Sequence, residues 1–134
     1  MSRILVVEDD DSVRHLLMDS LAQRAKLEVD GARDGVEALH RVTTSRYGVV
    51  VLDLMMPHMS GVDFLESLRM MTSDPSLEHL DATPAVIVLT GAPQDVVATE
   101  ELAERFPSLV HRVLRKPVDL DALVASVSST IDAS

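Results

Sequence analysis

Val49-Val50-Val51-Leu52-Asp53 is the stretch that decides the fold, because an unbroken apolar run ends there at a single carboxylate. A short β-branched run bounded by a polar residue is typical of a strand buried on both faces, as in a parallel sheet. In an open parallel sheet, ligands bind outside the carboxyl ends of the strands. We therefore expect Asp53 to end a central strand and to lie at a functional site.

Reactive side chains follow three other short stretches that are rich in apolar residues. These are residues 4–7 before Glu8 and Asp9, residues 86–89 before Thr90, and residues 110–114 shortly before Lys116. The carboxyl ends of parallel strands share one edge of a sheet, so three carboxylates, one hydroxyl and one ammonium are expected to meet there. This combination of groups suits a divalent metal and a phosphoryl group.

Strand-like and helix-like patterns alternate along the chain, which predicts an α/β fold with a doubly wound, five-stranded parallel sheet and about five helices. The predicted strands are residues 3–7, 28–32, 48–52, 85–89 and 110–114. The predicted helices are 12–25, one after Asp34, one after the loop from Pro57 to Gly61, one from Pro93 to about Phe106, and one from Asp119 to about 131. Residues 72–83 are polar and predict a long connection.

The first predicted helix carries apolar residues at helical spacing. We expect one side of this helix to pack on the sheet through Val13, Leu16, Leu17 and Leu21. The acidic residues before it have two readings, since carboxylates favour helix N-termini as well as metal ions. Asp10, Asp11 or Ser12 can cap the helix, which leaves Glu8 and Asp9 for a metal.

Composition narrows the function classes. The chain has 134 residues, 46% of them apolar, no cysteine and a formal net charge of −10. We expect a single domain over 1–134 that does not bind nucleic acid directly, because that needs clustered cations. No apolar run approaches the roughly 18 residues of a membrane span, and no leader pattern opens the chain, so we expect no membrane insertion and a cytoplasmic location.

The carboxylates predict the chemistry of the site. Like charges raise one another's proton affinity unless a cation neutralises them, and Mg²⁺ takes carboxylates with water and phosphate. Aspartate can also act as a nucleophile and form an aspartyl phosphate. Asp53 suits that role, Glu8 and Asp9 suit the metal, and Lys116 and Thr90 suit the phosphoryl oxygens.

These residues stand in an ordered set of short motifs. In chain order they are Val7-Glu8-Asp9-Asp10, residues 32–39 (ARDGVEAL), Asp53-Leu54-Met55-Met56-Pro57 with Gly61, Leu89-Thr90-Gly91, and Lys116-Pro117. Each motif is weak alone, but the ordered set resembles the receiver domain of bacterial two-component response regulators, chemotaxis regulators included. The resemblance covers essentially the whole chain. It implies the flavodoxin-like strand order 2-1-3-4-5.

The resemblance also implies roles for individual residues. Asp53 is then the phosphoacceptor, and Mg²⁺, with Mn²⁺ as the alternative ion, is held by Asp9, Asp53 and the backbone carbonyl of Met55, with Glu8 acting mainly through water. Lys116 contacts the phosphoryl group, and Thr90 moves toward it. The Lys116-Pro117 peptide bond is expected to be cis.

The same resemblance implies partners. The phosphoryl donor is a histidine kinase or a histidine phosphotransfer protein, and the output is a change of protein contacts with an unknown target. A homodimer through the face of the fourth helix, fifth strand and fifth helix is also possible. We expect a signalling switch that partly catalyses its own phosphorylation and dephosphorylation, not a turnover enzyme.

Two alternatives and one departure accompany this interpretation. A phosphohydrolase of the haloacid-dehalogenase type carries a second aspartate two residues after its nucleophile, where this chain has Met55. A receiver-like interaction module with a vestigial site is the other alternative. The departure is Val113, which stands where receivers usually carry a tyrosine or phenylalanine. We therefore expect phosphorylation to change the output face less than is usual.

Overall fold

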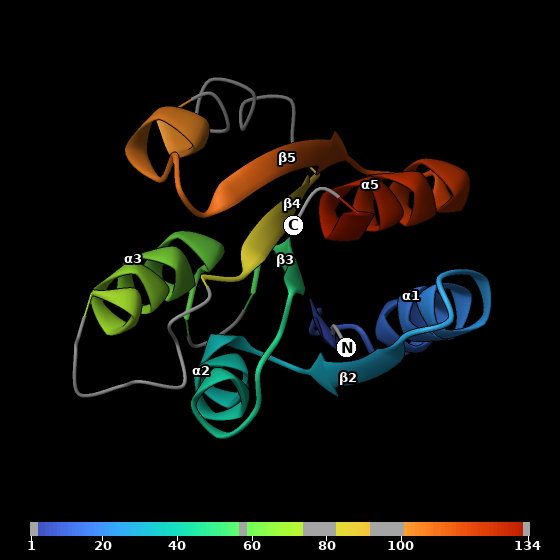
Figure 1. Ribbon diagram of the computed structural model, residues 1–134, viewed down its shortest axis with the longest axis horizontal. Helices are drawn as coiled ribbons and strands as arrows, with labels where there is room; N and C mark the ends of the chain where they lie inside the picture. Colours follow the sequence, from blue (N-terminus) through green and yellow to red (C-terminus); the bar gives the residue numbers. More distant parts are fainter. Residues whose placement is uncertain (1–2, 57–58, 74–82, 92–100, 133–134) are drawn as a thin grey trace.

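Five parallel strands form one sheet in the order β2-β1-β3-β4-β5, as expected (Figure 1). The computed structural model describes residues 3–56, 59–73, 83–91 and 101–132. The strands are β1 (Arg3–Val7), β2 (Glu28–Ala32), β3 (Val49–Asp53), β4 (Ala85–Thr90) and β5 (Val110–Arg115). The helices are α1 (Asp11–Arg24), α2 (Gly35–Thr44), α3 (Gly61–Thr72) and α5 (Leu120–Asp132), and residues 101–105 are also helical.

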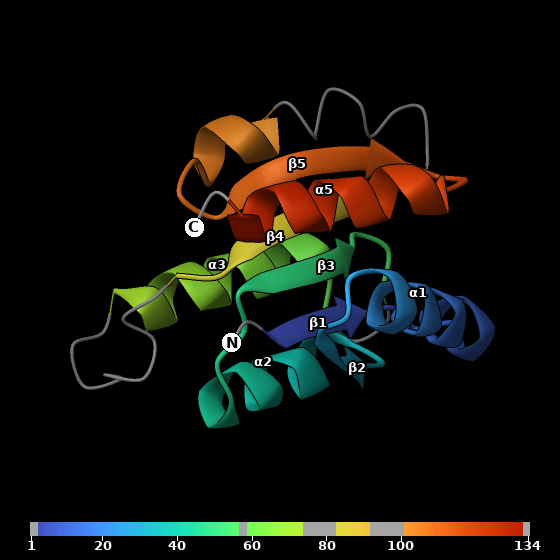
Figure 2. The same ribbon diagram turned by 45° about the vertical axis from the view of Figure 1, so that its right-hand side comes forward.

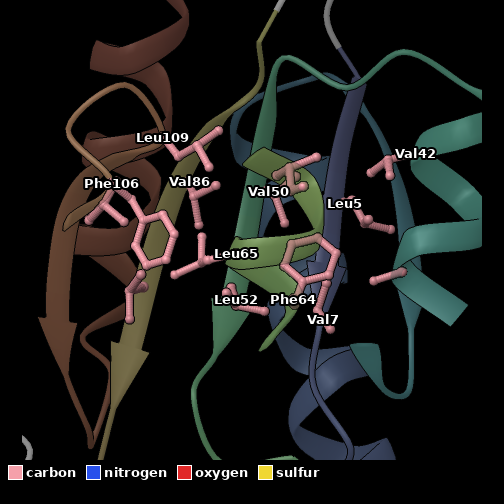
Figure 3. Close-up of a cluster of buried hydrophobic side chains, with 14 of the residues drawn as sticks. Leu5, Val7, Val42, Val50, Leu52, Phe64, Leu65, Val86, Phe106 and Leu109 are labelled. Atoms are coloured by element: carbon pink, nitrogen blue, oxygen red, sulfur yellow. The ribbon is translucent and has the colours of Figure 1, made fainter. Parts of the chain in front are cut away.

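The strands β1, β3 and β4 are buried on both sides because helices cover both faces of the sheet. In Figure 1, α1 and α5 lie on one face and α2 and α3 on the other. Under α2 and α3 the apolar side chains include Leu5, Val50, Phe64 and Phe106 (Figure 3). A second cluster, including Ile4, fills the space under α1 and α5.

Short polar side chains cap the N-termini of α1, α2 and α3, and none of these caps is a residue of the predicted site. The Asp10 carboxylate accepts a hydrogen bond from the Val13 N–H at 3.0 Å, and the Asp34 carboxylate accepts one from the Glu37 N–H at 2.9 Å. The hydroxyl of Ser60 caps α3 through the Asp63 N–H at 3.2 Å. These bonds satisfy amide donors that a helix leaves without partners in its first turn. Asp10 is therefore the cap of α1, and Glu8 and Asp9 are not.

The prediction for the packing of α1 was wrong for two of its four residues. Leu17 and Leu21 are buried, but Val13 and Leu16 are 37% and 54% exposed. The third position on the buried side belongs to Arg14, which is only 8% exposed. Positions 14, 17 and 21 share one side of a helix as well as 13, 16, 17 and 21 do, so spacing alone cannot fix the rotation of the helix on the sheet.

The other predicted elements whose two ends lie within the described residues agree with the structure to within one or two residues at those ends. The Lys116–Pro117 peptide bond is cis, as expected. Thr72, predicted to begin the long connection, ends α3 instead. Most of that connection (74–82), Pro57 and the predicted start of the fourth helix at Pro93 lie outside the described residues. Among the helices that are described, none is long and apolar enough to cross a membrane.

Candidate functional site

The strand ends meet because neighbouring strands run parallel and in register, with their arrowheads pointing the same way (Figure 2). Asp53 pairs with Leu89, the residue before Thr90, and Thr90 pairs with Arg115. The Lys116 N–H then donates to the carbonyl of Thr90 at 2.7 Å. The ends of β3, β4 and β5 are thus fixed side by side by backbone hydrogen bonds.

An irregularity in β5 determines which residue reaches this edge. Val86 pairs with Val110 but Ile87 pairs with Arg112, so His111 is an extra residue in β5. A one-residue change of register turns every later side chain to the other face of a sheet. Without the extra residue, Leu114 would stand beside Thr90, and Lys116 would lie one position further along.

Three carboxylates gather at this edge. Glu8 and Asp53 are 2% and 1% exposed, whereas Asp9 is exposed. One oxygen from each of Glu8, Asp9 and Asp53 lies within 4.8 Å of the other two. Two buried carboxylates so close together repel each other, and this arrangement is stable only with a compensating cation.

Lys116 supplies part of that compensation. Its Nζ lies 3.0 Å from Asp53 Oδ2 and 3.5 Å from Glu8 Oε2. Partial burial of the amine works against its charged form, but the two carboxylates outweigh this effect and raise the pKa of Lys116. The amine is therefore a permanent ammonium between two carboxylates.

The ammonium of Lys116 does not fully offset the cost of burying the charged Glu8 carboxylate. Burial and then the nearby charge of Asp53 raise the pKa of Glu8 to about 7. Its Oε1 accepts a hydrogen bond from the Asp10 N–H at 3.3 Å, while its buried Oε2 accepts none from the described residues. A second cation bound next to this buried oxygen would stabilise the negative charge of Glu8.

The donor set fits a hard divalent ion. All three clustered side chains are carboxylates, and no histidine or cysteine of the described residues belongs to the cluster. Oxygen ligands of this kind suit Mg²⁺ or Mn²⁺, whereas zinc sites usually include nitrogen or sulfur donors.

The remaining predicted residues take different positions around Asp53. Thr90 is 3% exposed and ends β4. The Met55 N–H donates to Asp53 Oδ1 at 3.1 Å, which fixes one carboxylate oxygen, while the Met55 side chain is 65% exposed. The part of the Met55 carbonyl in metal binding stays a prediction.

Comparison with known sequences agrees with this geometry. The sequence profile described as "Response regulator receiver domain" matches residues 4–128. The chain belongs to the response regulator receiver domain family. This receiver domain is 36% identical over 137 residues to the response regulator MprA of Mycobacterium avium, covering 96% of this chain and 59% of that protein. It is 37% identical to MprA of Mycobacterium bovis, covering 87% of this chain and 53% of that protein. The chain therefore spans just over half the length of these relatives.

Solved structures give the same result. The receiver domain of the Francisella response regulator 1452 superposes with a TM-score of 0.77 at 27% identity, covering 99% of this chain and 98% of that one. The response regulator protein TrrA of Thermotoga maritima, in complex with Mg²⁺ and BeF, superposes with a TM-score of 0.76 at 28% identity, covering 97% and 99%.

One residue of the site region was not anticipated from the sequence. Arg14 lies on the buried side of α1, and its guanidinium donates to the backbone carbonyl of Glu8 at 3.0 Å. The signal for it was a charged residue at i−3 and i−7 from Leu17 and Leu21, in line with the apolar stripe. A charged residue in such a position usually lies at the border of an apolar stripe, so its burial does not follow from the sequence.

The repulsion between Glu8 and Asp53 leads to a prediction for the metal-free receiver domain. We expect Asp53→Asn to raise the free energy of unfolding by about 1–2 kcal/mol at pH 8, because it removes one of two buried like charges. Because the pKa of Glu8 is raised in the folded protein, the free energy of unfolding falls as the pH increases from 4.5, the ordinary pKa of this group, to about 7. The advantage of the variant over wild type should therefore grow across that range.

Urea unfolding with chelator present measures both proteins. Adding Mg²⁺ should stabilise the wild type and leave Asp53→Asn nearly unchanged. A variant less stable than wild type at pH 8 would show that the ion pair with Lys116 outweighs the repulsion.

Proposed function

We propose that this receiver domain accepts a phosphoryl group on Asp53 from the phosphohistidine of a histidine kinase or a histidine phosphotransfer protein. The observation that carries the proposal is the placement of the Asp53 carboxylate, 3.0 Å from the Lys116 ammonium and grouped with the oxygens of Glu8 and Asp9. Membership of the receiver family supports the same conclusion.

Asp53 is the nucleophile in this proposal. One carboxylate oxygen attacks phosphorus while the bond from phosphorus to the histidine nitrogen breaks, and the electron pair stays on that nitrogen of an imidazole that is protonated on its other ring nitrogen. Its Oδ1 is held by the Met55 N–H, so the carboxylate enters the reaction already oriented. The product is an aspartyl phosphate and a neutral histidine on the donor.

Lys116 and Thr90 act on the transferred group. The ammonium of Lys116 leaves its contact with Asp53 Oδ2 and neutralises a phosphoryl oxygen. Thr90 ends the neighbouring strand β4, and its hydroxyl donates a hydrogen bond to a second phosphoryl oxygen. When bound by Glu8, Asp9, Asp53 and the Met55 carbonyl, Mg²⁺ would supply further positive charge against these oxygens.

An aspartyl-phosphate phosphohydrolase is the second candidate, and the local geometry disfavours it. Its general acid would stand at Met55, a thioether with no proton to give. A vestigial interaction module is disfavoured by the complete group of acidic, hydroxyl and ammonium side chains. We propose a signalling switch whose output is a change of protein contacts, including a possible homodimer through the fourth helix, β5 and α5.

The donor must dock next to Asp53, and an apolar groove borders the site there. The groove has a volume of about 300 Å³ and includes Lys116 in its lining. Its other lining residues come from α1, the end of β4, the segment before α5 and the first residue of α5: Val13, Leu16, Leu17, Leu89, Pro117, Val118 and Leu120. We propose that an amphipathic helix of the donor packs here, against the exposed Val13 and Leu16.

The first test is phosphotransfer from the host's histidine kinases to the wild type and to Asp53→Asn. We expect an intact-mass increase by one phosphoryl group on the wild type only, and only with Mg²⁺ present. A phosphoryl group on the variant, or elsewhere in the wild type, would contradict the role of Asp53. Binding of beryllium fluoride with Mg²⁺ separates a working site from a vestigial one.

The docking groove predicts a selective defect. We expect Leu16→Lys to slow transfer from the cognate kinase by about tenfold or more, the equivalent of 1.4 kcal/mol of lost docking energy. Transfer from acetyl phosphate, which needs no docking helix, should be unchanged. Val36→Lys is the matched control, because Val36 is 56% exposed on α2, which covers the opposite face of the sheet. Equal slowing by both variants would place the docking surface elsewhere.

The departure at Val113 leads to a further expectation. Val113 pairs with Val88 and is only partly buried, and its side chain has no ring to change rotamer. Amide chemical shifts with and without beryllium fluoride should change strongly near Asp53 and Thr90 and little along β5. Large changes throughout β5 would mean that the signal passes without an aromatic residue.

A further inference from the structure

A buried arginine holds the peptide bond that joins the first two acidic residues of the site. Arg14 is 8% exposed, and it is the one lysine or arginine among the buried residues of the described chain. Burying a guanidinium is costly unless it is paired and hydrogen-bonded. Arg14 meets both conditions, so its partners show which groups the buried guanidinium holds in place.

Those partners lie at the β1–α1 turn. Nη1 donates to the Glu8 carbonyl at 3.0 Å, and Nη2 forms an ion pair with the carboxylate of Asp11. The Glu8 carbonyl belongs to the peptide unit that links Glu8 to Asp9. A constraint on this unit therefore acts on the directions of both side chains.

The carbonyl of Glu8 needs a side-chain donor because the backbone hydrogen bonds between β1 and β2 end at this turn. The Glu8 N–H still donates to Ala32 of β2 at 3.0 Å. The chain following β2 then turns away, because Asp34 caps α2. The next carbonyl of the ladder, that of Glu8, receives its hydrogen bond from Arg14 instead of from the backbone.

The fold makes room for the arginine at one position of β2. A Cβ atom on Gly31 would lie 2.7 Å from Met18 Sδ and 3.2 Å from Arg14 Cδ. Gly31 pairs with Val6, two residues before Glu8. A glycine inside a strand weakens it and often marks a close approach by another group, and here the approaching groups are the stems of Arg14 and Met18.

We propose that Arg14 is a positioning residue for the metal site, holding the peptide between Glu8 and Asp9 so that both carboxylates face the cation. The inference rests on the proposed function, because it takes Glu8 and Asp9 as metal ligands. Groups that support metal ligands in this indirect way typically affect metal affinity by 10–100-fold.

The test is a titration with Mg²⁺ alone, followed by ¹H–¹⁵N NMR of the folded protein. We expect Arg14→Met, which keeps an apolar stem and removes the guanidinium, to raise the Kd for Mg²⁺ by about tenfold. The amide signals of residues 8–10 should also shift in the metal-free variant. Arg24→Met is the matched control, because Arg24 lies on the exposed last turn of the same helix and pairs with Asp121. It removes the same charge from the chain without touching Glu8.

The outcomes separate the possibilities. Unchanged affinity in Arg14→Met, or equal weakening in Arg24→Met, would overturn the positioning role while leaving the proposed function intact. A wild type that binds no Mg²⁺ would overturn the metal site itself. If Arg14→Met does not fold, Asp11→Asn takes its place, since Asp11 is exposed and anchors the same guanidinium. Asp11→Asn should weaken Mg²⁺ binding measurably, and wild-type affinity there would also count against the inference.

Discussion

The ion pair between Lys116 and Asp53 is the interaction on which the site depends. It connects the ends of β5 and β3 across the intervening β4, with 3.0 Å between the charged atoms. The same ammonium lies 3.5 Å from Glu8, so one cation partly neutralises two buried carboxylates. Compensation is incomplete, because burial of the carboxylate and then the nearby charge of Asp53 still raise the pKa of Glu8. A pocket left with excess negative charge attracts a divalent cation, and the cation in turn makes a phosphoryl group acceptable beside a carboxylate.

The sheet keeps these charges in place because it is rigid. The central strands are apolar and buried on both faces, so their positions are fixed by close packing against helices on either side. The backbone hydrogen bonds from Lys116 to Thr90 and from Leu54 to Leu89 continue this order just past the strand ends. Reactive groups on such a scaffold need little reorganisation when a phosphoryl donor arrives.

Helix α1 serves both sides of this chemistry. Its buried side carries Arg14, which donates a hydrogen bond to the carbonyl of Glu8 beside the acidic cluster. Its exposed side carries Val13 and Leu16, which border the apolar groove beside Lys116. The rotation of one helix on the sheet therefore fixes both the hydrogen bond to Glu8 and the apolar surface beside Lys116.

Local patterns in the chain were enough to predict those features that depend on neighbouring residues. Apolar runs ending at Glu8, Asp53 and Thr90 predict strands and a shared edge, because strand ends in a parallel sheet converge whatever the details of packing. Short polar residues before the helices predict the caps for the same local reason.

Only the tertiary structure decided which side of α1 is buried and which residue of β5 reaches the site. Helical spacing allows the stripe of Arg14, Leu17 and Leu21 as readily as one through Leu16, and in the folded protein Arg14 and Met18 pack closely against Gly31 of β2. The extra residue His111 in β5 likewise follows from pairing with β4, an interaction between segments distant in the chain. Rotation and register are set by contacts that no local pattern contains.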